Sequence, residues 1–542
     1  MKTKLRNMIA TVSLLALPNL NFAQAPNLGT AANFVLFSTN GAVSNTGISQ
    51  ITGNVGTNNG SSTAFGNVNG VMHDGDGASA QCAADLLIAY NQLNGTTATL
   101  FPAPLLGNGQ VLTPGVYAIS GNTTLNLDLT FNAQGNSNAV FIMKIQGAFS
   151  TNASAKVKLI NGAKACNVFW KIEGLVSMAA GTTMRGTIIA NNAAINISTG
   201  DTLEGRALST AGAVTIDGTF AYTPIGCGSP VLNGPVAPNL GAAACYGIFS
   251  SIGAVSNSGT TYVTGDIGSN SGSPTGYNPL FVTGTIHLTP DGSTAVTASD
   301  LLNAYAYVNT LAYDIELLYP AQFGNNLVLT PHVYRMNAAA ALTDTLYLNA
   351  LGNANAVFVI QIQGALTTST YSKIKLINGT QSKNVFWKIE GAVNINNYST
   401  FRGTIICNNG AIGALNTGVV FDGRVLTTNG ALSTTAINLV ATNLPSNCLT
   451  VGIKSNNDVN SSVKIYPNPF TTSLNISINS TIWQSNLCSF KLYNFSGSEI
   501  MSSDITKQLT TLEMNNLSSG IYFYKISYNN KTIESGKLIS QQ

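Results

Sequence analysis

The amino-acid sequence predicts an all-β-dominated protein with two tandem solenoid domains, each with one long α-helix alongside, and a small C-terminal β-sandwich. Three observations support this fold class. A 19-residue period recurs between residues 175 and 217, a long internal duplication covers most of the chain, and the sequence pattern changes near residue 456.

The 19-residue period is clearest in three aligned segments, residues 175–179, 194–198 and 213–217. Apolar residues alternate with small polar ones, and glycines recur at regular intervals. This pattern is typical of short strands separated by tight turns and does not fit a helix. A period near 20 residues indicates the coils of a β-solenoid, in which each coil buries its apolar face only when its neighbours stack on it.

The duplication relates the first half of the chain to the second. The run Gly41-Ala-Val-Ser-Asn-Thr-Gly recurs from Gly253 with one change, and residues 167–174, Asn-Val-Phe-Trp-Lys-Ile-Glu-Gly, recur intact as residues 384–391. Two homologous domains follow, residues 26–228 and 229–449. Pro230, Pro235 and Pro238 mark the segment that joins them.

Each copy contains one helical pattern. It spans about residues 78–93 in the first copy, with Leu86 and Leu87 on its apolar face, and about residues 297–318 in the second copy, with Leu301 and Leu302 in the same places. A helix with an apolar stripe and no helical partner must lie on the solenoid, where it covers one side of the coils.

The pattern changes again after a linker expected at residues 450–462. From Val463 the chain alternates apolar and polar residues, with strands expected at residues 473–478, 490–493 and 521–527. About 80 residues with this alternation, residues 463–542, predict a small β-sandwich.

Composition and the N-terminus point to an exported protein. Only 8% of the 542 residues are charged, and Lys2, Lys4 and Arg6 account for the whole net charge of +3. The remainder has no excess of basic residues, so nucleic acid is not an expected partner. Residues 1–25 have the basic start, apolar run and small residues of a secretory signal peptide. No later segment is long enough to span a bilayer.

Seven cysteines are present, and none forms a Cys-x-x-Cys pair, so a zinc site is not expected. Export permits disulfides, and the pairs Cys245–Cys448 and Cys166–Cys227 would each tie the two ends of one domain. Buried single thiols are an equally weighted alternative.

Both copies resemble the bacterial and fungal ice-binding protein family. The matching residues are the Val-Phe-Trp strands at 168–170 and 385–387, the Arg-Gly-Thr-Ile-Ile runs at 185–189 and 402–406, and the Gly-Arg-x-Leu runs at 205–208 and 423–426. The resemblance covers most of residues 28–440. It implies an irregular β-helix with a long helix alongside and adsorption to ice planes.

The last segment resembles the C-terminal sorting domain of type IX secretion. The matching residues are Tyr-Pro-Asn-Pro at 466–469, Leu-Tyr-Asn-Phe-Ser-Gly at 492–497 and Leu-Ser-Ser-Gly-Ile-Tyr at 517–522. The resemblance implies the type IX machinery as a partner and a location outside the cell or attached to its outer surface.

A stacked sheet offers a physical basis for binding a lattice. Outward residues lie about 6.6 Å apart along a strand and about 4.8 Å apart between coils, so short hydroxyl and amide side chains form a regular grid. Threonine adds rigidity at χ1. Aligning the coils predicts the ice-binding residues Ser177, Asn196, Ser198, Thr215, Asn394, Asn396, Asn416, Ser433 and Thr435.

The two predicted grids differ in charge. In the first copy Asp217 follows Ser198 in its column, and a carboxylate keeps its own hydration shell. In the second copy the columns are uncharged, with Ala414 between Asn394 and Ser433 and one extra residue near Gly413. The sequence therefore favours the second copy as the ice binder.

The remaining polar residues have structural interpretations. Arg185 and Glu204 lie one coil apart, as do Arg402 and Asp422, which predicts ion pairs between coils. The run His73-Asp-Gly-Asp76 lacks the ligand count of a calcium loop and is interpreted as turn and helix-entry chemistry. No catalytic constellation, metal site or cofactor is expected, so the chain is predicted not to be an enzyme.

The leading hypothesis is a secreted antifreeze or recrystallisation-inhibiting protein that adsorbs to ice. The alternative is a surface adhesin that binds polysaccharide or another cell through its solenoid faces. That alternative requires exposed aromatic side chains for sugar stacking, and the candidates are Tyr262, Tyr277, Tyr398, Phe401 and Phe421.

Overall fold

A computed structural model describes residues 23–226, 231–445, 448, 463–478, 488–515, 517–528 and 531–541. Residues 1–22 of the predicted signal peptide and the predicted linker 450–462 lie outside this range. The chain divides into two compact units, residues 1–444 and 445–542. Within the described residues, no helix has the length and apolarity needed to cross a membrane.

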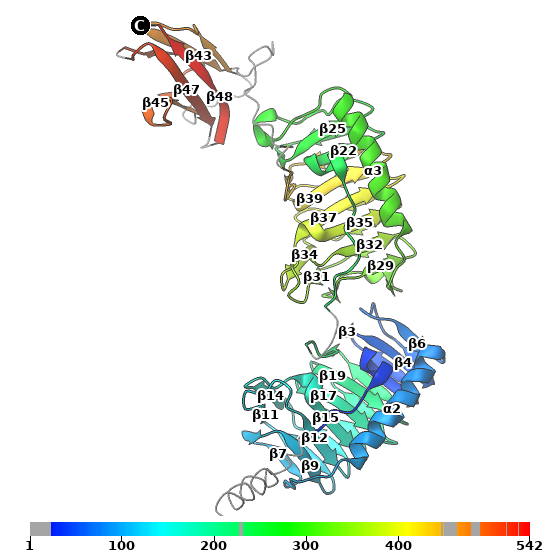
Figure 1. Ribbon diagram of the computed structural model, residues 1–542. Coiled ribbons are helices and arrows are strands. Elements are labelled where there is room, and N and C mark those ends of the chain that lie inside the picture. The colour runs from blue at the N-terminus through cyan, green and yellow to red at the C-terminus, as the bar shows by residue number, and fades with distance from the viewer. Residues whose placement is uncertain are drawn as a thin grey trace, which may run out of the picture. The chain divides into compact units, whose positions relative to one another are not determined.

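The first copy is built from two parallel sheets (Figure 1). The larger one, among the described residues, has 13 strands: β1 Phe34–Asn40, β3 Gln50–Thr52, β4 Asn54–Asn59, β6 Met72–Asp74, β8 Gln110–Leu112, β9 Gly115–Ile119, β11 Asp128–Asn132, β12 Phe141–Ile145, β14 Lys156–Ile160, β15 Val168–Ile172, β17 Thr183–Ala190, β19 Thr202–Ser209 and β21 Phe220–Tyr222. The smaller one has eight described strands, in the order β5 Ser62–Thr63, β2 Val43–Thr46, β20 Val214–Asp217, β18 Ile195–Ile197, β16 Val176–Ser177, β13 Phe149–Thr151, β10 Thr123–Asn126 and β7 Leu105–Gly107.

The second copy repeats this design. Its larger sheet has 14 described strands: β22 Tyr246–Ser250, β24 Tyr262–Thr264, β25 Asp266–Ser269, β26 Val282–Thr283, β27 Ile315–Glu316, β28 Val328–Leu329, β29 Val333–Met336, β31 Thr345–Asn349, β32 Phe358–Ile362, β34 Lys373–Ile377, β35 Val385–Ile389, β37 Thr400–Cys407, β39 Val420–Thr427 and β41 Asn438–Val440. Its smaller sheet has six, in the order β23 Val255–Ser258, β40 Leu432–Thr435, β38 Ile412–Leu415, β36 Val393–Ile395, β33 Leu366–Thr368 and β30 Ala340–Leu342. The predicted pair of tandem β-helices is confirmed.

The coils do not stack in chain order. In the first copy, the coil that contains β1 and β2 comes first in sequence but lies against the coil of β19 and β20. In the second copy, β22 and β23 lie in the same way against β39 and β40. This reordering makes each β-helix irregular. The side chains inside the coils form one continuous apolar core per copy.

One α-helix runs along the larger sheet of each copy, α2 Gly77–Gly95 and α3 Gly292–Thr310 (Figure 1). Asp76 and Asp291 are the N-caps, and each forms a capping box with the residue at N3. These caps set the start of each helix, because their carboxylates accept the otherwise unpaired first amide groups. The prediction for residues 78–93 is confirmed.

The prediction of a second helix over residues 297–318 was wrong at both ends. The Asp291 cap starts the helix five residues earlier, and the chain leaves the helix after Thr310 and forms β27. Buried Gln361 satisfies the terminal carbonyls, because its Nε2 donates to the oxygens of Val308 and Leu311, both at 2.9 Å. The apolar residues beyond Leu311 belong to the β-helix.

The faces of the two helices also differ from the prediction. Leu87 and Leu302 lie on the outer side, 54% and 56% exposed. The buried stripes are Ser79, Cys82, Leu86, Ala89 and Leu93 in α2 and Thr294, Thr297, Leu301, Ala304 and Val308 in α3. Small residues in these stripes let the helix approach the sheet closely.

The C-terminal unit is a β-sandwich with its own apolar core, as predicted. One antiparallel sheet contains β42 Val463–Tyr466, β43 Ser473–Ile478 and β46 Leu509–Glu513. The other contains β45 Glu499–Ile505, β44 Cys488–Tyr493, β47 Gly520–Tyr528 and β48 Lys531–Ser540.

Cys166, Cys245 and Cys448 are disulfide-bonded. Their predicted partners include Cys227, which lies outside the described residues. Cys82, Cys407 and Cys488 are free, buried thiols. Burial raises the pKa of the Cys407 thiol to about 12, which keeps it protonated and unreactive.

Candidate functional site

The smaller sheet of each copy is a surface that the long helix does not cover. In the first copy, α2 packs on the larger sheet, against apolar residues such as Phe34, Ile142 and Leu208. In the second copy, α3 packs against Phe249, Ile406 and Leu426 in the same way. We call the outward surface of the smaller sheet the ladder face, because its side chains form columns across the coils.

The central column of the first ladder face contains predicted residues Ser177, Asn196 and Thr215. Strand register places them on three neighbouring coils. The column extends beyond them in both directions. In strand order its members are Thr63, Ser44, Thr215, Asn196, Ser177, Ser150, Thr124 and Leu105.

A second column of the same face contains Ser198 and Asp217. Ile197 pairs with Ile216, which places the two residues that follow side by side, and Asp217 also pairs with Thr46 of β2. The Asp217 carboxylate accepts a hydrogen bond from the Thr199 hydroxyl. It is the one charged residue in the eight strands of this sheet.

The buried side chain of Asp201 hydrogen-bonds to the backbone of Ser198. Oδ2 of Asp201 accepts from the Ser198 amide at 2.9 Å, and Oδ1 accepts from the Thr182 amide at 2.8 Å. Burial raises the pKa of Asp201 to about 6, and these backbone hydrogen bonds oppose that rise. Asp201 therefore supports the column without adding charge to its surface.

The second ladder face carries the other predicted residues. Its central column, in strand order, is Thr275, Ser256, Ser433, Ala414, Asn394, Thr367 and Ala341. The register shifts around Gly413, as the extra residue predicted. None of the six strands of this sheet contains a charged or aromatic residue.

The second column of this face contains Ser258, Thr435, Asn416 and Asn396. The hydroxyl oxygens of Ser258 and Thr435 lie 3.0 Å apart, and Nδ2 of Asn416 donates to Oδ1 of Asn396 at 3.1 Å. In the first copy, Oγ1 of Thr215 similarly donates to Oδ1 of Asn196 at 2.7 Å. These contacts between coils hold the side chains in fixed orientations.

Several members of the central columns were missed at the sequence level. Ser44 and Ser256 come from the first coil of each copy, which the 19-residue alignment did not include. A signal for them exists, because Gly41-Ala-Val-Ser resembles Gly212-Ala-Val-Thr, and Gly253-Ala-Val-Ser resembles Gly430-Ala-Leu-Ser. Each pair lies side by side in the structure.

Charged residues gather instead on the uncovered part of the larger sheets. Arg185 pairs with Glu204 at 2.8 Å and Arg402 pairs with Asp422 at 2.7 Å, each across one coil. Both predicted ion pairs are confirmed. The strands of the ladder faces, by contrast, contain one charged residue in the first copy, Asp217, and none in the second.

The His-Asp run of each copy has a structural role. Nδ1 of His73 lies 2.7 Å from the carboxylate of Asp76, the N-cap of α2, so the interpretation as helix-entry chemistry is confirmed. In the second copy, Nδ1 of His287 lies 2.8 Å from the carboxylate of Asp291, the N-cap of α3.

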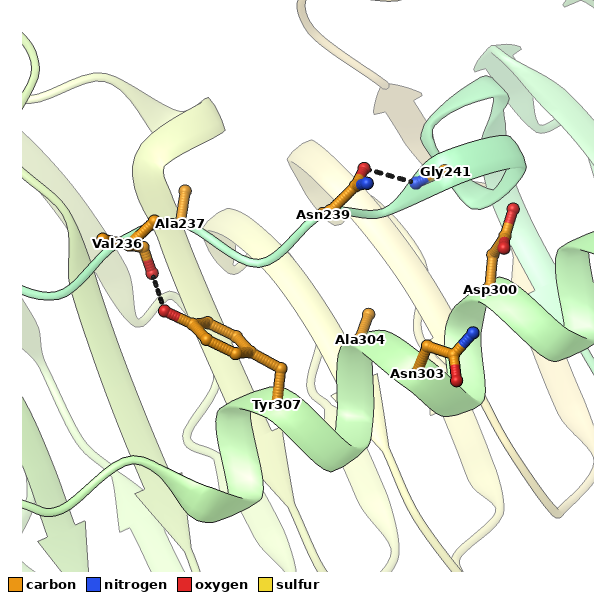
Figure 2. Close-up of a pocket in the computed structure, with 8 residues that line it drawn as sticks. All are labelled: Val236, Ala237, Asn239, Gly241, Asp300, Asn303, Ala304 and Tyr307. Atoms are coloured by element: carbon orange, nitrogen blue, oxygen red, sulfur yellow. Dashed lines mark hydrogen bonds between the residues drawn. The ribbon is translucent and has the colours of Figure 1, made fainter.

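A small pocket lies between α3 and the segment that joins the copies (Figure 2). Its contacts hold that segment in place: the Tyr307 hydroxyl donates to the Val236 carbonyl at 3.0 Å, and Asp300 accepts from the Ala242 amide at 2.7 Å. Asn239 accepts from the Gly241 amide at 3.0 Å. These hydrogen bonds pack the joining segment against α3, which gives the pocket a structural role.

A family model described as ice-binding-like matches residues 37–221 and 249–439, which together are more than half of the chain. The chain belongs to the ice-binding-like family. The match falls once on each β-helix, so the two copies are two members of this family in tandem.

Named relatives and solved structures agree with this assignment. An ice-binding protein of Nostoc sp. is 38% identical over 35% of this chain and 71% of its own length, and one of Colwellia sp. is 32% identical over 37% and 84%. The crystal structure of an ice-binding protein from an Antarctic Flavobacteriaceae bacterium is 59% identical, with a TM-score of 0.76 over 77% of this chain and 99% of that one.

The C-terminal unit matches a secretion system C-terminal sorting domain over residues 464–541. This tandem ice-binding-like protein therefore ends in a type IX sorting domain, as predicted. The chain is secreted or attached to the outer cell surface.

Proposed function

We propose that the chain adsorbs to ice through its ladder faces, principally that of the second copy. One observation carries the proposal: strand register aligns short, uncharged side chains over consecutive coils, on a sheet without charged or aromatic residues. Its named relatives are ice-binding proteins.

The spacing and rigidity of the columns support this function. Neighbouring coils lie about 4.8 Å apart and alternate residues of a strand about 6.6 Å apart, so the polar groups form a repeating grid. Contacts such as Asn416 to Asn396 fix the side chains before ice arrives. Little conformational entropy is then lost on adsorption.

The residues that we propose to contact ice in the first copy are Ser177, Asn196, Ser198 and Thr215. Those in the second copy are Asn394, Asn396, Asn416, Ser433 and Thr435. Asp217 makes the first face the weaker of the two, because a carboxylate retains its hydration shell.

The test uses the full chain with a bulky side chain placed on one face at a time. Ser433→Tyr blocks the second face, Thr215→Tyr blocks the first, and Asn438→Tyr places the same bulk on the exposed strand β41 of the larger sheet. Thermal hysteresis and the shape of a single ice crystal are measured for each.

We expect Ser433→Tyr to lose most of the hysteresis, Thr215→Tyr to lose less, and Asn438→Tyr to behave like the unsubstituted chain. Equal effects of all three variants, or an unsubstituted chain that leaves the crystal shape unchanged, would contradict the proposal.

We further propose that the chain is not an enzyme and needs no metal or cofactor. His73 and His287 contact the helix caps Asp76 and Asp291, and the buried Asp201 supports a turn. Among the described residues, no group of three His, Cys, Asp or Glu side chains is placed to hold a metal ion.

The adhesin alternative requires exposed aromatic side chains, and three of the five proposed residues are not exposed. Phe401 and Phe421 are buried in the core, each 1% exposed, and Tyr277 packs against the same core. Tyr262 contacts Phe281, with ring centroids 4.9 Å apart. The two candidates that remain exposed are Tyr262, at 45%, and Tyr398, which is 49% exposed and stacks on Tyr371.

A further inference from the structure

One corner of each β-helix carries a row of left-handed residues. This corner joins the smaller sheet to the larger one, and one residue per coil has a positive φ. In the first copy the row is Leu127, Ser154, Gly181, Gly200, Gly218 and Gly47. In the second copy it is Asp344, Tyr371, Tyr398, Gly418, Ala436 and Gly259.

Two positions of this row differ sharply between the copies. Ser154 and Gly181 of the first copy correspond to Tyr371 and Tyr398 of the second, with φ of 61° and 58°. The same amide-to-carbonyl bonds to the next coil confirm the correspondence. A left-handed tyrosine costs about 1 kcal/mol or more of backbone strain, so two adjacent ones call for a functional explanation.

The two tyrosines form an exposed aromatic platform. Tyr371 is 64% exposed and Tyr398 is 49% exposed, and their rings stack at 5.1 Å and 15°. Gly418 makes room for them, because a Cβ there would lie 2.3 Å from the Tyr398 ring. The platform therefore depends on the absence of a side chain at Gly418, the next position of the row.

Cations lie beside this platform. Lys373 and Lys375 are exposed on β34, and with Thr400 and Arg402 they line a depression. In the described residues neither lysine pairs with a carboxylate. Arg402 does pair, with Asp422.

The first copy lacks this arrangement. There Lys158 pairs with Asp128 at 2.5 Å. The residue that corresponds to Asp128 in the second copy is Thr345, and Lys375 instead lies over the ring of Tyr347 at 5.3 Å. The acid is therefore moved by one residue, from Asp128 of the first copy to Asp344 of the second, and the second copy gains three tyrosines at and beside this corner. Asp344 takes the place of Leu127 in the row, and its carboxylate accepts a hydrogen bond from Nδ2 of Asn326.

We propose that Tyr371, Tyr398, Lys373 and Lys375 form a binding site for an acidic polysaccharide. The C–H faces of sugar rings pack on exposed aromatic faces, and carboxylates of the same polymer meet the two unpaired lysines. The site lies at the corner beside the ladder face of the second copy, outside the columns proposed to contact ice. A secreted chain with both surfaces holds ice and an extracellular polymer independently.

The experiment is affinity electrophoresis of the full chain in native gels that contain alginate, an acidic polysaccharide, or neutral dextran. The double variant Tyr371→Ser/Tyr398→Gly restores the residues of the first copy, and Lys373→Gln/Lys375→Gln removes the charge. Tyr262→Ser removes an exposed tyrosine elsewhere on the larger sheet. Melting temperature and thermal hysteresis are measured for every variant.

We expect alginate to retard the unsubstituted chain more than dextran does, in a manner that salt weakens. Each double variant loses about tenfold or more in alginate affinity, while Tyr262→Ser keeps it and hysteresis is unchanged throughout. Absence of retardation, equal retardation by both polymers, or retention of affinity in the tyrosine variant would overturn the proposal. Thermal hysteresis is measured separately from alginate binding. A chain without ice activity would therefore leave the test of the polysaccharide site unaffected.

Discussion

Short polar side chains have different roles on the ladder faces and at the starts of the two helices. On the ladder faces, residues such as Thr215 and Asn416 bond to the equivalent residue on the next coil and leave their remaining polar groups to water. At the helix entries, Asp76 and Asp291 cap the helices with one carboxylate oxygen and contact a histidine with the other. The position of a short polar residue therefore decides whether it belongs to the outward grid or supports the fold.

His287 adds a pH-dependent contribution to the second helix entry. Nε2 lies 3.9 Å from the Asp266 carboxylate and Nδ1 lies 2.8 Å from that of Asp291. The two acids raise the pKa of His287 above its ordinary 6.5, against the opposing effect of burial. A raised pKa means that this stabilisation is complete below pH 6.5 and is lost as pH rises through the higher folded-state value.

We therefore expect the melting temperature of the chain to fall by about 2 °C as pH rises from 6 to 9, with His287→Gln showing a flatter profile. Differential scanning calorimetry at several pH values measures this. Parallel profiles for the two proteins would show that His287 is uncharged or uncoupled.

At the scale of elements, a buried polar clamp attaches each helix to its sheet. Lys171 of β15 pairs with Glu173, which also accepts from the Tyr90 hydroxyl of α2 at 2.8 Å and from Asn191 at 2.8 Å. Despite burial, these hydrogen bonds hold the pKa of Glu173 below its usual range. The second copy repeats the clamp with Tyr305, Lys388, Glu390 and Asn408.

The clamp gives the Lys and the Glu of the recurrent run Asn-Val-Phe-Trp-Lys-Ile-Glu-Gly the same role in both copies. We expect Glu173→Gln to lower the free energy of unfolding by about 1.5–3 kcal/mol, because it weakens hydrogen bonds to a charged group and leaves buried Lys171 unpaired. Denaturant unfolding measures the change.

The matched control is Asp128→Asn, which breaks the ion pair with Lys158 on the surface. Both of its side chains are more than a third exposed, so we expect a loss below about 1 kcal/mol. A loss as large as that of Glu173→Gln would contradict a special role for the clamp.

At the scale of the whole molecule, each β-helix is closed by contacts between distant parts of the chain. Ser44 of the first coil pairs with Thr215 near the end of the same copy. The C-terminal sandwich has a separate core and forms its own compact unit. The sorting domain and the β-helices therefore each fold around an apolar core of their own.

We expect deletion of residues 463–542 to leave the β-helices folded but to block passage across the outer membrane, since the sorting domain is lost. Cell fractionation in a host with type IX secretion measures this, with the unsubstituted chain as control. Normal amounts of the shortened chain outside the cell would show that the tail is dispensable.

Much of the architecture was predictable because it depends on local and periodic signals. Alternating residues and the 19-residue step predicted the coils and the stacked pair Arg185–Glu204, and the pair Arg402–Asp422 followed once one extra residue was allowed. The C-terminal end of α3 was not predictable, because Gln361, more than 50 residues away along the chain, satisfies its last carbonyls.

By itself, the sequence determined the class of fold, the number of copies and three neighbouring members of each central column, since these depend on repeats and alternation within short segments. Only the tertiary structure decided which coils are neighbours, and so added Ser44 and Ser256 to their columns and placed Tyr371 against Tyr398. The reason is physical: strand pairing between coils is non-local, and the first coil of each copy is buried between the second coil and the last one.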